Sequence, residues 1–266
     1  MVRSGQEQGL VILIHLGILD NRSGACPCNY GAMSGANSLL SICSERKYPG
    51  RGLVLGSDIR GVAFGLYWLT GRSHASQQRR IQLAESTVVV QDLTDGPRDE
   101  LRHYTAAVRN SRAVMLGNGT HVLDVWDDVE AGATFDEAHR KIDYEPDPPI
   151  FTPRITGLAS LTPGGAHGFV TAGAASDPRW PGITQHRSLH IDAPAPGQGQ
   201  LVTTYSGDLD TPRADGNPSA VNIESSWESL VSDVWEVLDP TLKVAVVAFP
   251  LQDTSFLSGI LQNKHA

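Results

Sequence analysis

Two short apolar segments, each flanked by glycine and arginine, constrain the fold of this chain more than any other feature. The first covers residues 53–55, the second covers residues 62–69, and a turn lies between them at residues 57–61. This spacing predicts two neighbouring strands joined in a hairpin. Arg51 precedes the first strand and Arg72 follows the second. In an antiparallel hairpin these two positions are neighbours, so we expect both arginines at one edge of a sheet.

Arginines in this setting indicate a binding site for an anion. Planar, permanently charged guanidinium groups suit phosphate and carboxylate, and the adjacent glycines let a ligand approach the backbone. Arg79 and Arg80 follow in a polar loop, where only one of the two needs to face the site. Surface arginines are common, but the paired glycine context favours function for Arg51 and Arg72. We therefore expect a site for a phosphorylated small molecule.

The composition excludes several classes of function. The 266 residues are 40% hydrophobic and 19% charged, which is ordinary for a globular protein that can bury a sizeable core. The net charge of −8, without any basic run, argues against nucleic acid as a partner. Cys26, Cys28 and Cys43 lack the spacing of a zinc site and form no even disulfide framework. We therefore expect no metal and a cytoplasmic location.

The first 32 residues differ in character from the rest. The apolar run at residues 10–19 is too short to span a bilayer, so we expect no membrane partner. It partly resembles a secretory signal, but the polar residues 20–22 interrupt that pattern; an ordinary structural element is the other alternative. We favour Met33 as the native start. Residues 1–32 are then a disordered or non-native extension, and residues 33–266 form a single domain.

Apolar periodicity predicts a mixture of short helices and strands. Helical spacing and capping signals predict helices at residues 38–46, 99–110, 122–131, 134–140 and 227–238, with a capping box from Thr134 to Glu137. Besides the hairpin, strands are expected at residues 81–83, 87–93, 113–116, 155–161, 169–174, 188–191, 200–206, 243–249 and 256–261. The mixture indicates an α+β fold that is largely antiparallel, with a sheet-on-sheet core and helices outside.

Two segments rich in glycine or proline are further candidates. Residues 117–121 (Gly-Asn-Gly-Thr-His) lie between an expected strand and an expected helix, where backbone N–H groups can hold an anion; Asn-Gly is first of all a turn. Prolines stiffen residues 143–154 and exclude a helix there. Glu145 in this segment is a candidate acid or base, with Arg154 at its end. On composition alone, an exposed acidic loop is the simpler interpretation.

The motifs of several common enzyme classes are absent. The sequence lacks the G-x-S-x-G elbow, the G-x-x-x-x-G-K-[ST] loop, a G-x-G-x-x-G turn after a strand and the H-E-x-x-H helix motif. Their absence argues against α/β-hydrolases, P-loop enzymes, dinucleotide-binding folds and zincins.

The ordered set of motifs resembles the archaeal-type IMP cyclohydrolases and their bacterial relatives. Order and spacing agree from about residue 48 onwards, although no single motif is specific. The matching segments are residues 48–52 (YPGRG), 67–73 (YWLTGRS), 79–80 (RR), 117–121 (GNGTH), 144–147 (YEPD), 151–155 (FTPRI), 204–208 (TYSGD) and 263–265 (NKH), together with Tyr104. The resemblance implies a four-layer αββα sandwich of two mainly antiparallel sheets. Such a fold is similar to that of the N-terminal-nucleophile hydrolases, without their freed nucleophile.

The resemblance also implies a reaction and roles for individual residues. A purine ribotide, 5-formamidoimidazole-4-carboxamide ribotide, would close to IMP with loss of water, as the last step of purine synthesis, without cofactor or metal. For catalysis the resemblance implies Glu145 as general base, Tyr104 and Asn118 as donors to the developing oxyanion, and Arg154 as the residue that orients Glu145 or the substrate. The implied substrate-binding residues are Arg51, Arg72, Ser73, Arg79, Arg80, Gly117, Gly119 and His121. A homo-oligomer is compatible with this assignment.

The chain departs from the family pattern beside Tyr104. This residue lacks the usual asparagine after it, and the arginine that follows is displaced by one position to Arg109. Two other functions stay open. One is a protein that binds and senses a purine ribotide without converting it. The other is an amide hydrolase on the same scaffold, for which Cys43 or Ser44 is the candidate nucleophile.

Overall fold

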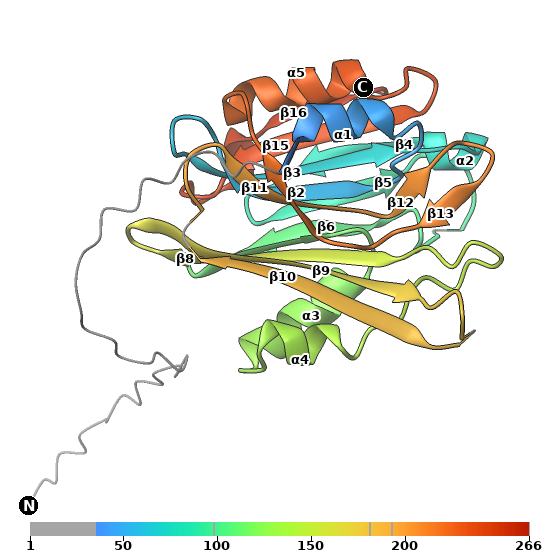
Figure 1. The fold of residues 1–266 in the computed structure, drawn as a ribbon, viewed down its shortest axis with the longest axis horizontal. Helices are drawn as coiled ribbons and strands as arrows, with labels where there is room; N and C mark the ends of the chain where they lie inside the picture. The colour runs from blue at the N-terminus through green and yellow to red at the C-terminus, as the bar shows by residue number, and fades with distance from the viewer. Residues whose placement is uncertain (1–35, 98, 181, 193, 266) are drawn as a thin grey trace, which may run out of the picture. The chain divides into compact units, whose positions relative to one another are not determined.

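The computed structural model describes residues 36–97, 99–180, 182–192 and 194–265 (Figure 1). Residues Ser34–Ala266 form one compact unit. The expected extension over residues 1–32, with its apolar run and the favoured start at Met33, lies outside the described residues, so the domain boundary stays a prediction. No helix in the described ranges has the length and apolarity that crossing a membrane requires.

Two seven-stranded sheets make up most of this unit (Figure 1). The first has the order β1 (Asn37–Ser38), β14 (Ser219–Asn222), β11 (Gln198–Thr203), β2 (Gly52–Ser57), β3 (Ala63–Thr70), β15 (Lys243–Pro250) and β16 (Ile260–Asn263). The second has the order β10 (Thr184–Asp192), β9 (Gly165–Ser176), β8 (Arg154–Thr162), β7 (Ala113–Gly117), β6 (Tyr104–Arg109), β5 (Thr87–Asp92) and β4 (Arg79–Leu83). Neighbouring strands are antiparallel except for β1 and β14, so the expected α+β class with mainly antiparallel sheets is confirmed.

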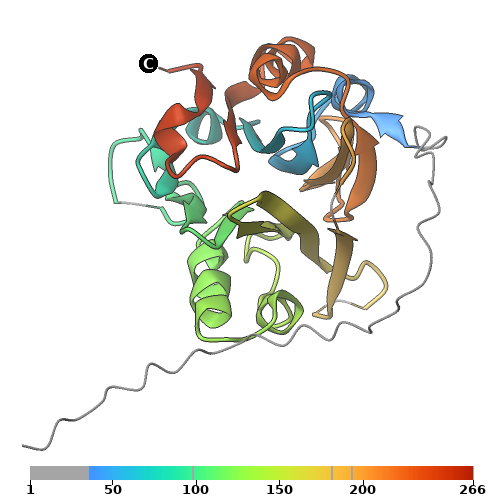
Figure 2. The ribbon, with the colours of Figure 1, turned by 90° about the vertical axis from the view of Figure 1, so that its left-hand side faces the viewer.

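The main hydrophobic core lies between the two sheets, which stack face to face (Figure 2). Leu53 and Leu55 of β2 point into this core, whereas Val54 between them packs on the other face of the same sheet. Both faces of β2 are therefore buried. A strand buried on both faces needs apolar side chains throughout, which explains the continuous apolar runs from which the hairpin was predicted.

Helices cover the outer faces of both sheets (Figure 1). α1 (Leu39–Glu45) and α5 (Trp227–Val237) pack on the first sheet, and α3 (His121–Glu130) and α4 (Phe135–His139) pack on the second. All four were predicted from the sequence and are confirmed. A short helix, α2 (His74–Gln77), lies in the segment expected to be a polar loop.

The predicted capping box is confirmed at the start of α4. Thr134 Oγ1 accepts a hydrogen bond from the backbone N–H of Glu137 at 3.3 Å, and Glu137 Oε2 accepts one from the backbone N–H of Thr134 at 2.9 Å. The reciprocal bonds satisfy two N–H groups that a helix of this length would otherwise leave to water.

The predicted helix at residues 99–110 is wrong, because residues 104–109 form strand β6. Val88 of β5 pairs with Ala107 and Val89 pairs with Thr105, so Ala106 is an extra residue in the ladder, a β-bulge. The bulge breaks the alternation of a strand and buries Tyr104 and Ala107, three positions apart, as well as Ala106. Buried residues three positions apart are typical of one face of a helix, which explains why a helix was predicted here.

Two other predicted elements need correction. Residues 256–261 were expected as one strand, but they begin with a 3-10 turn, η1 (Phe256–Ser258), before β16. The strand expected at residues 200–206 divides into β11 and β12 (Tyr205–Gly207), and β12 pairs with β13 (Pro212–Ala214) in a separate ribbon. The division brings Tyr205 to the end of the first sheet where the arginines lie.

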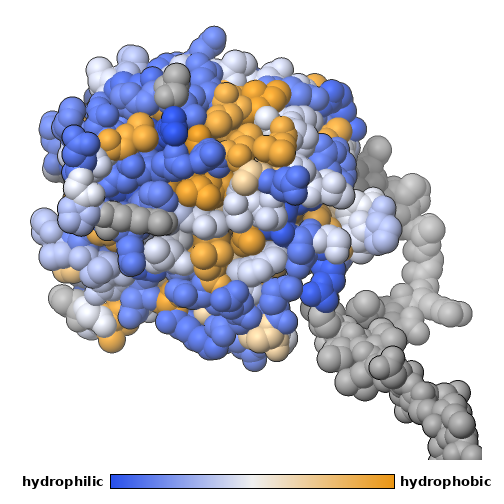
Figure 3. Space-filling model, turned by 180° about the vertical axis from the view of Figure 1, so that it is seen from behind, coloured by the Kyte–Doolittle hydropathy of each residue, from blue (hydrophilic) through white to orange (hydrophobic). Residues whose placement is uncertain are grey.

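The most exposed large apolar side chains lie in three separate turns or loops: Trp180 and Ile183 share one turn, and Ile59 and Leu257 lie elsewhere in the chain. Figure 3 shows one face of the molecule, on which hydrophobic residues gather near the middle and hydrophilic residues border them. Scattered residues of this kind are normal for a globular protein. A homo-oligomer, which the sequence analysis found compatible with the chain, stays untested.

Candidate functional site

The hairpin of β2 and β3 brings the predicted arginines to one edge of the first sheet. Gly50 O accepts hydrogen bonds from the backbone N–H of Thr70 at 3.1 Å and from Thr70 Oγ1 at 2.8 Å, so Arg51 lies beside the end of β3. Gly50 has a φ of +69°, and a Cβ atom there would lie 2.1 Å from Thr204 Oγ1. Only glycine fits both conditions.

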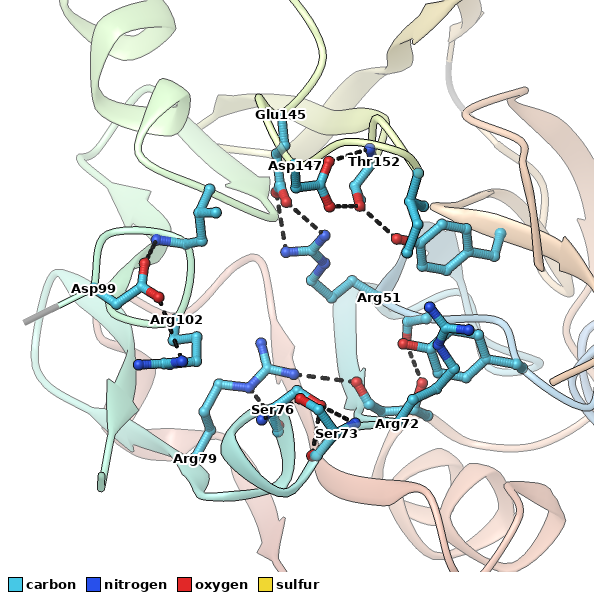
Figure 4. Close-up of a pocket in the computed structure, with 16 residues that line it drawn as sticks. Arg51, Arg72, Ser73, Ser76, Arg79, Asp99, Arg102, Glu145, Asp147 and Thr152 are labelled. Carbon is cyan, nitrogen blue, oxygen red and sulfur yellow. Dashed lines mark hydrogen bonds and ion pairs between the residues drawn. The ribbon is translucent and has the colours of Figure 1, made fainter. Parts of the chain in front are cut away.

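A cavity of about 500 Å³ opens at this edge (Figure 4). Five residues that the sequence predicted line it together: Arg51, Arg72, Ser73, Arg79 and Glu145. The remaining lining residues are Tyr48, Gly50, Thr70, Ser76, Asp99, Leu101, Arg102, Asp147, Ile150, Thr152 and Tyr205. The cavity thus collects side chains from both sheets and from the proline-rich segment.

Arg51 and Glu145 form a bidentate ion pair at the cavity wall. Nη1 lies 3.0 Å from Oε1 and Nη2 donates to Oε2 at 3.1 Å, while the two residues are only 8% and 3% exposed. Burial raises the pKa of Glu145, and the charge of Arg51 opposes that rise. Burial is the largest single influence on the pKa of Arg51 and works to lower it, but Glu145, Tyr104, Tyr67 and Tyr205 together hold that pKa well above its ordinary value. The Glu145 carboxylate therefore binds a proton more tightly than usual, and it lines a cavity that a ligand can enter.

Arg72 and Arg79 line the same cavity without a carboxylate partner in the described part of the chain. Arg79 is 4% exposed and donates to the backbone carbonyls of Ser76 at 2.7 Å and Thr70 at 3.1 Å. Arg72 is exposed, donates to Leu209 O at 3.3 Å and lies over the ring of Tyr48, 5.3 Å from its centroid. Two positive charges without a counter-charge favour an anion in the space between them.

The proline-rich segment is folded back on itself and positions Glu145. The backbone N–H of Glu145 donates to Thr152 O at 2.8 Å. Asp147 accepts from the backbone N–H of Thr152 at 2.7 Å and from its hydroxyl, which also contacts the Tyr205 hydroxyl. The sequence predicted the stiffness of this segment but not the closure by Asp147 and Thr152. The Asp-x-x-x-x-Thr spacing is too common to have indicated it.

Arg102 is a second part of the cavity lining that the sequence did not predict. Its Nε lies 2.9 Å from Asp92 Oδ2 and its Nη1 lies 3.4 Å from Asp99 Oδ2, so both of these carboxylates already compensate its charge. It lines the same cavity as Arg79 (Figure 4). No local motif marked this residue, because its contact with Asp92 at the end of β5 and its place at the cavity depend on the completed fold.

The glycine-rich segment lies behind Glu145 rather than in the cavity lining. The fully buried Asn118 donates from Nδ2 to Pro153 O at 2.9 Å and to Glu145 Oε1 at 3.5 Å, and accepts from the backbone N–H of Ile155 at 2.8 Å. A Cβ atom on Gly117 would lie 2.6 Å from Val122 Cγ2, so this glycine permits close packing of α3. Gly119 and His121 lie on the same turn, also outside the lining.

Three other predicted residues occupy neighbouring positions. The hydroxyl of Tyr104 lies 2.8 Å from that of Tyr67, across the two sheets, and both rings are buried beside Arg51. Arg154 opens β8, and its charge also opposes the raised pKa of Glu145. Arg80 points away from the cavity and donates to Gln91 Oε1 at 2.8 Å, because adjacent residues of a strand face opposite sides. None of the three lines the cavity.

Comparison with known proteins identifies the family. Residues 48–254 match the family model described as IMP cyclohydrolase-like protein. A search of curated proteins found no match. The matched range contains every residue of the cavity lining and every predicted site residue.

Proposed function

Because the chain belongs to the IMP cyclohydrolase-like protein family, we propose that it closes 5-formamidoimidazole-4-carboxamide ribotide to IMP with loss of water. The observation that carries this proposal is the shared cavity. It is lined by a buried carboxylate, Glu145, together with Arg72 and Arg79, two arginines that have no carboxylate partner among the described residues. An anionic substrate with a reacting end that must lose a proton fits this combination.

The proposed substrate orientation follows from the charges. Arg72, Arg79 and Ser73 bind the phosphate, since they present donors to the cavity and none of them pairs with a carboxylate in the part of the chain that the structure describes. Arg51 joins the phosphate and ribose contacts from its ion pair with Glu145. Arg154, at the far side of Glu145, is proposed to orient that carboxylate. For Arg80 and the glycines at 117 and 119, contact with substrate stays a prediction.

The proposed chemistry needs little beyond positioning and proton transfer. The carboxamide nitrogen attacks the formyl carbon of the same molecule, so near-attack geometry supplies much of the rate. Glu145 accepts the carboxamide proton as the C–N bond forms. The formyl C–O bond then breaks, and the departing water takes up one hydrogen from the carboxamide nitrogen and one from the formamide nitrogen.

The developing oxyanion needs donors, for which we propose Tyr104 and Asn118. Both Asn118 Nδ2 hydrogens have acceptors, but the contact with Glu145 is long at 3.5 Å. Asn118 therefore serves as a donor only when substrate entry opens this contact. We further propose the family's four-layer sandwich as the fold, a cytoplasmic location, and catalysis without metal or cofactor.

Purified protein mixed with the formylated ribotide tests the proposal directly. We expect a change in ultraviolet absorbance as the purine ring forms, and chromatography should identify IMP as the product. A protein that only senses ribotides would bind IMP, as calorimetry would show, but would leave the absorbance unchanged. That result would overturn the enzymatic proposal.

An amide hydrolase on this scaffold is disfavoured by its candidate nucleophiles. Cys43 is 2% exposed and burial raises its pKa to about 12, so the thiol stays protonated and unreactive. Ser44 donates its hydroxyl to Ser41 O at 2.8 Å within α1. Neither residue lines the cavity. Mass spectrometry of active protein with its chain intact ahead of Cys43 would exclude a processed nucleophile.

A further inference from the structure

His121 is fully buried beside the candidate base, and half of its hydrogen-bonding capacity is unused. It begins α3 and lies behind the cavity wall, with 0% exposure. Nε2 lies 3.3 Å from Ile155 O and 3.1 Å from Thr156 Oγ1. Nδ1 has no hydrogen-bond partner among the described residues. A buried polar atom without a partner is unfavourable, so it needs an explanation.

The contacts of Nε2 favour one tautomer. The Ile155 carbonyl can only accept, so its contact with Nε2 favours the hydrogen on that nitrogen, and the Thr156 hydroxyl can accept it as well. Burial lowers the pKa of His121 well below its ordinary value, and the positive charge of Arg154 acts in the same direction. The imidazole is therefore neutral, and Nδ1 presents a bare lone pair.

Gly119 opens a slot between this lone pair and Glu145. A Cβ atom at position 119 would lie 3.2 Å from His121 Nδ1 and 3.7 Å from Glu145 Oε1. Both polar atoms thus border the space that the missing side chain leaves. His121 Cε1, at 3.6 Å, is the third of the three atoms nearest to that Cβ position. Any side chain larger than hydrogen would come between the two residues.

Of the titratable groups around the slot, Glu145 is the one whose protonation state changes in the proposed reaction. Arg51 and Arg154 face Glu145 as cations, and Asp147 is the nearby anion. Arg154, His139 and Arg51 face His121. Arg51 is held in its ion pair and stays protonated, and the burial of His139 lowers its pKa to about 3. Among these groups, Glu145 is the one that gains a proton during the proposed reaction.

We propose that His121 is a positioning residue for Glu145: its neutral imidazole accepts, at Nδ1, the hydrogen bond of the Glu145 carboxyl group once that group has taken the carboxamide proton. The bond runs through the Gly119 slot. It rests on the proposed function of Glu145 as the base, and it favours the protonated carboxyl group at the stage when the proton must be held. When the proton passes to the departing water, the bond opens and Nδ1 returns to its unpartnered state.

Nuclear magnetic resonance of the full chain without substrate tests the proposal independently of turnover. The ¹⁵N shifts of His121 should show a neutral Nε2–H tautomer, and the Nδ1 shift should move as the ¹³C-labelled Glu145 carboxyl group titrates. An Nδ1–H tautomer, or a protonated ring at pH 7, would overturn the proposal. So would an Nδ1 shift that responds to Arg154→Met but not to the titration of Glu145, because Arg154 Nε is also buried without a partner.

Variants on both sides of the slot give the second test. His121→Phe removes the acceptor and Gly119→Ala fills the slot, so both should lower the pKa of Glu145 and shift the acidic limb of kcat to lower pH. We expect kcat to fall about tenfold with KM unchanged, as for the loss of one hydrogen bond to a reacting group. Gly164→Ala, on an exposed turn with 3.8 Å to the nearest atom, and Thr156→Val, which spares Ile155 O, should leave the limb in place.

The two readouts separate the proposals. A Glu145 pKa that stays unchanged in both His121→Phe and Gly119→Ala overturns the positioning role, whatever the turnover. A Glu145 pKa that shifts as expected in a protein without cyclohydrolase activity supports the positioning role and overturns the proposed function instead.

Discussion

Each end of the stacked sheets contains a cavity bordered by a buried arginine. The two ends differ in the partners of their arginines. At one end, Arg51 pairs with Glu145, while Arg72 and Arg79 have no carboxylate partner in the described chain. At the other end, Arg109 closes strand β6, donates to the carbonyls of Leu251 and Asp253, and lies 5.2 Å from the centroid of the Phe256 ring.

The larger cavity is not the candidate site. The cavity at the Arg109 end has a volume of about 730 Å³, against about 500 Å³ at the Arg51 end. Arg112 there is paired with Glu130, whereas Arg109 donates to carbonyls, as Arg79 does, and has no carboxylate ion pair among the described residues. Burial lowers the pKa of Arg109, whereas its ion pair holds that of Arg51 high. The candidate site is therefore distinguished by two arginines without a carboxylate ion pair that line one cavity together with the buried Glu145, rather than by volume.

The largest effect is expected from Glu145→Gln. The amide cannot accept the carboxamide proton, so kcat should fall about 1,000-fold, within the usual range for a general base. Affinity for IMP, measured by calorimetry, should change far less. Glu130→Gln, which alters an exposed partner of Arg112, is the matched control. Unchanged turnover in Glu145→Gln would contradict the assignment of the base.

Arg79→Met should weaken ribotide binding without an equal loss of kcat. A hydrogen bond to a charged group contributes about 1.5–3 kcal/mol, so we expect the Kd for IMP to rise about 10- to 100-fold. The dephosphorylated nucleoside should bind both proteins equally weakly, since it lacks the group that Arg79 is proposed to hold. A similar loss of affinity for nucleoside and nucleotide would place the phosphate elsewhere.

Arg109→Met sharpens the comparison from the other end. It leaves the carbonyls of Leu251 and Asp253 without their donor, and the free energy of unfolding should fall by about 2 kcal/mol, measured by urea denaturation. KM and kcat below the unfolding transition should stay at wild-type values. Loss of ribotide affinity in this variant would contradict the division between a binding end and a structural end.

The sequence predicted the binding end better than the structural end, for a physical reason. The arginines at positions 51 and 72 are carried by a local hairpin, whose strands and turn are encoded within about twenty residues, and the capping box of α4 is more local still. The bulge at Ala106 hid strand β6, and with it the positions of Tyr104 and Arg109, because its pairing with β5 is a property of two strands together. Contacts such as Thr152 with Tyr205 depend on the completed fold and leave no local signal.

The pH dependence of turnover tests the environment of Glu145. Burial raises the pKa of this carboxyl group above 4.5, its ordinary value. The base works only when deprotonated, so kcat should be constant above the raised pKa and fall tenfold per pH unit below it. The same sign applies to stability: the folded protein binds this proton more tightly, so the contribution of Glu145 is greatest below pH 4.5 and is lost as pH rises through the raised pKa. An acidic limb at or below pH 4.5 would contradict the burial argument.

The smallest effect is expected from a substitution of Arg112. This residue lines the larger cavity, so its substitution tests whether that cavity has a role in ribotide binding. Its side chain is 69% exposed, and Nη2 lies 3.2 Å from Glu130 Oε2 in an ion pair that solvent screens. Arg112→Ala should change the free energy of unfolding by less than about 1 kcal/mol and leave KM for the ribotide unchanged. Arg72 is likewise exposed but has no carboxylate partner among the described residues, so Arg72→Ala should cost little stability while raising KM. If the two alanine variants instead behaved alike in both measurements, the ion pair with Glu130 would not be what distinguishes Arg112 from Arg72.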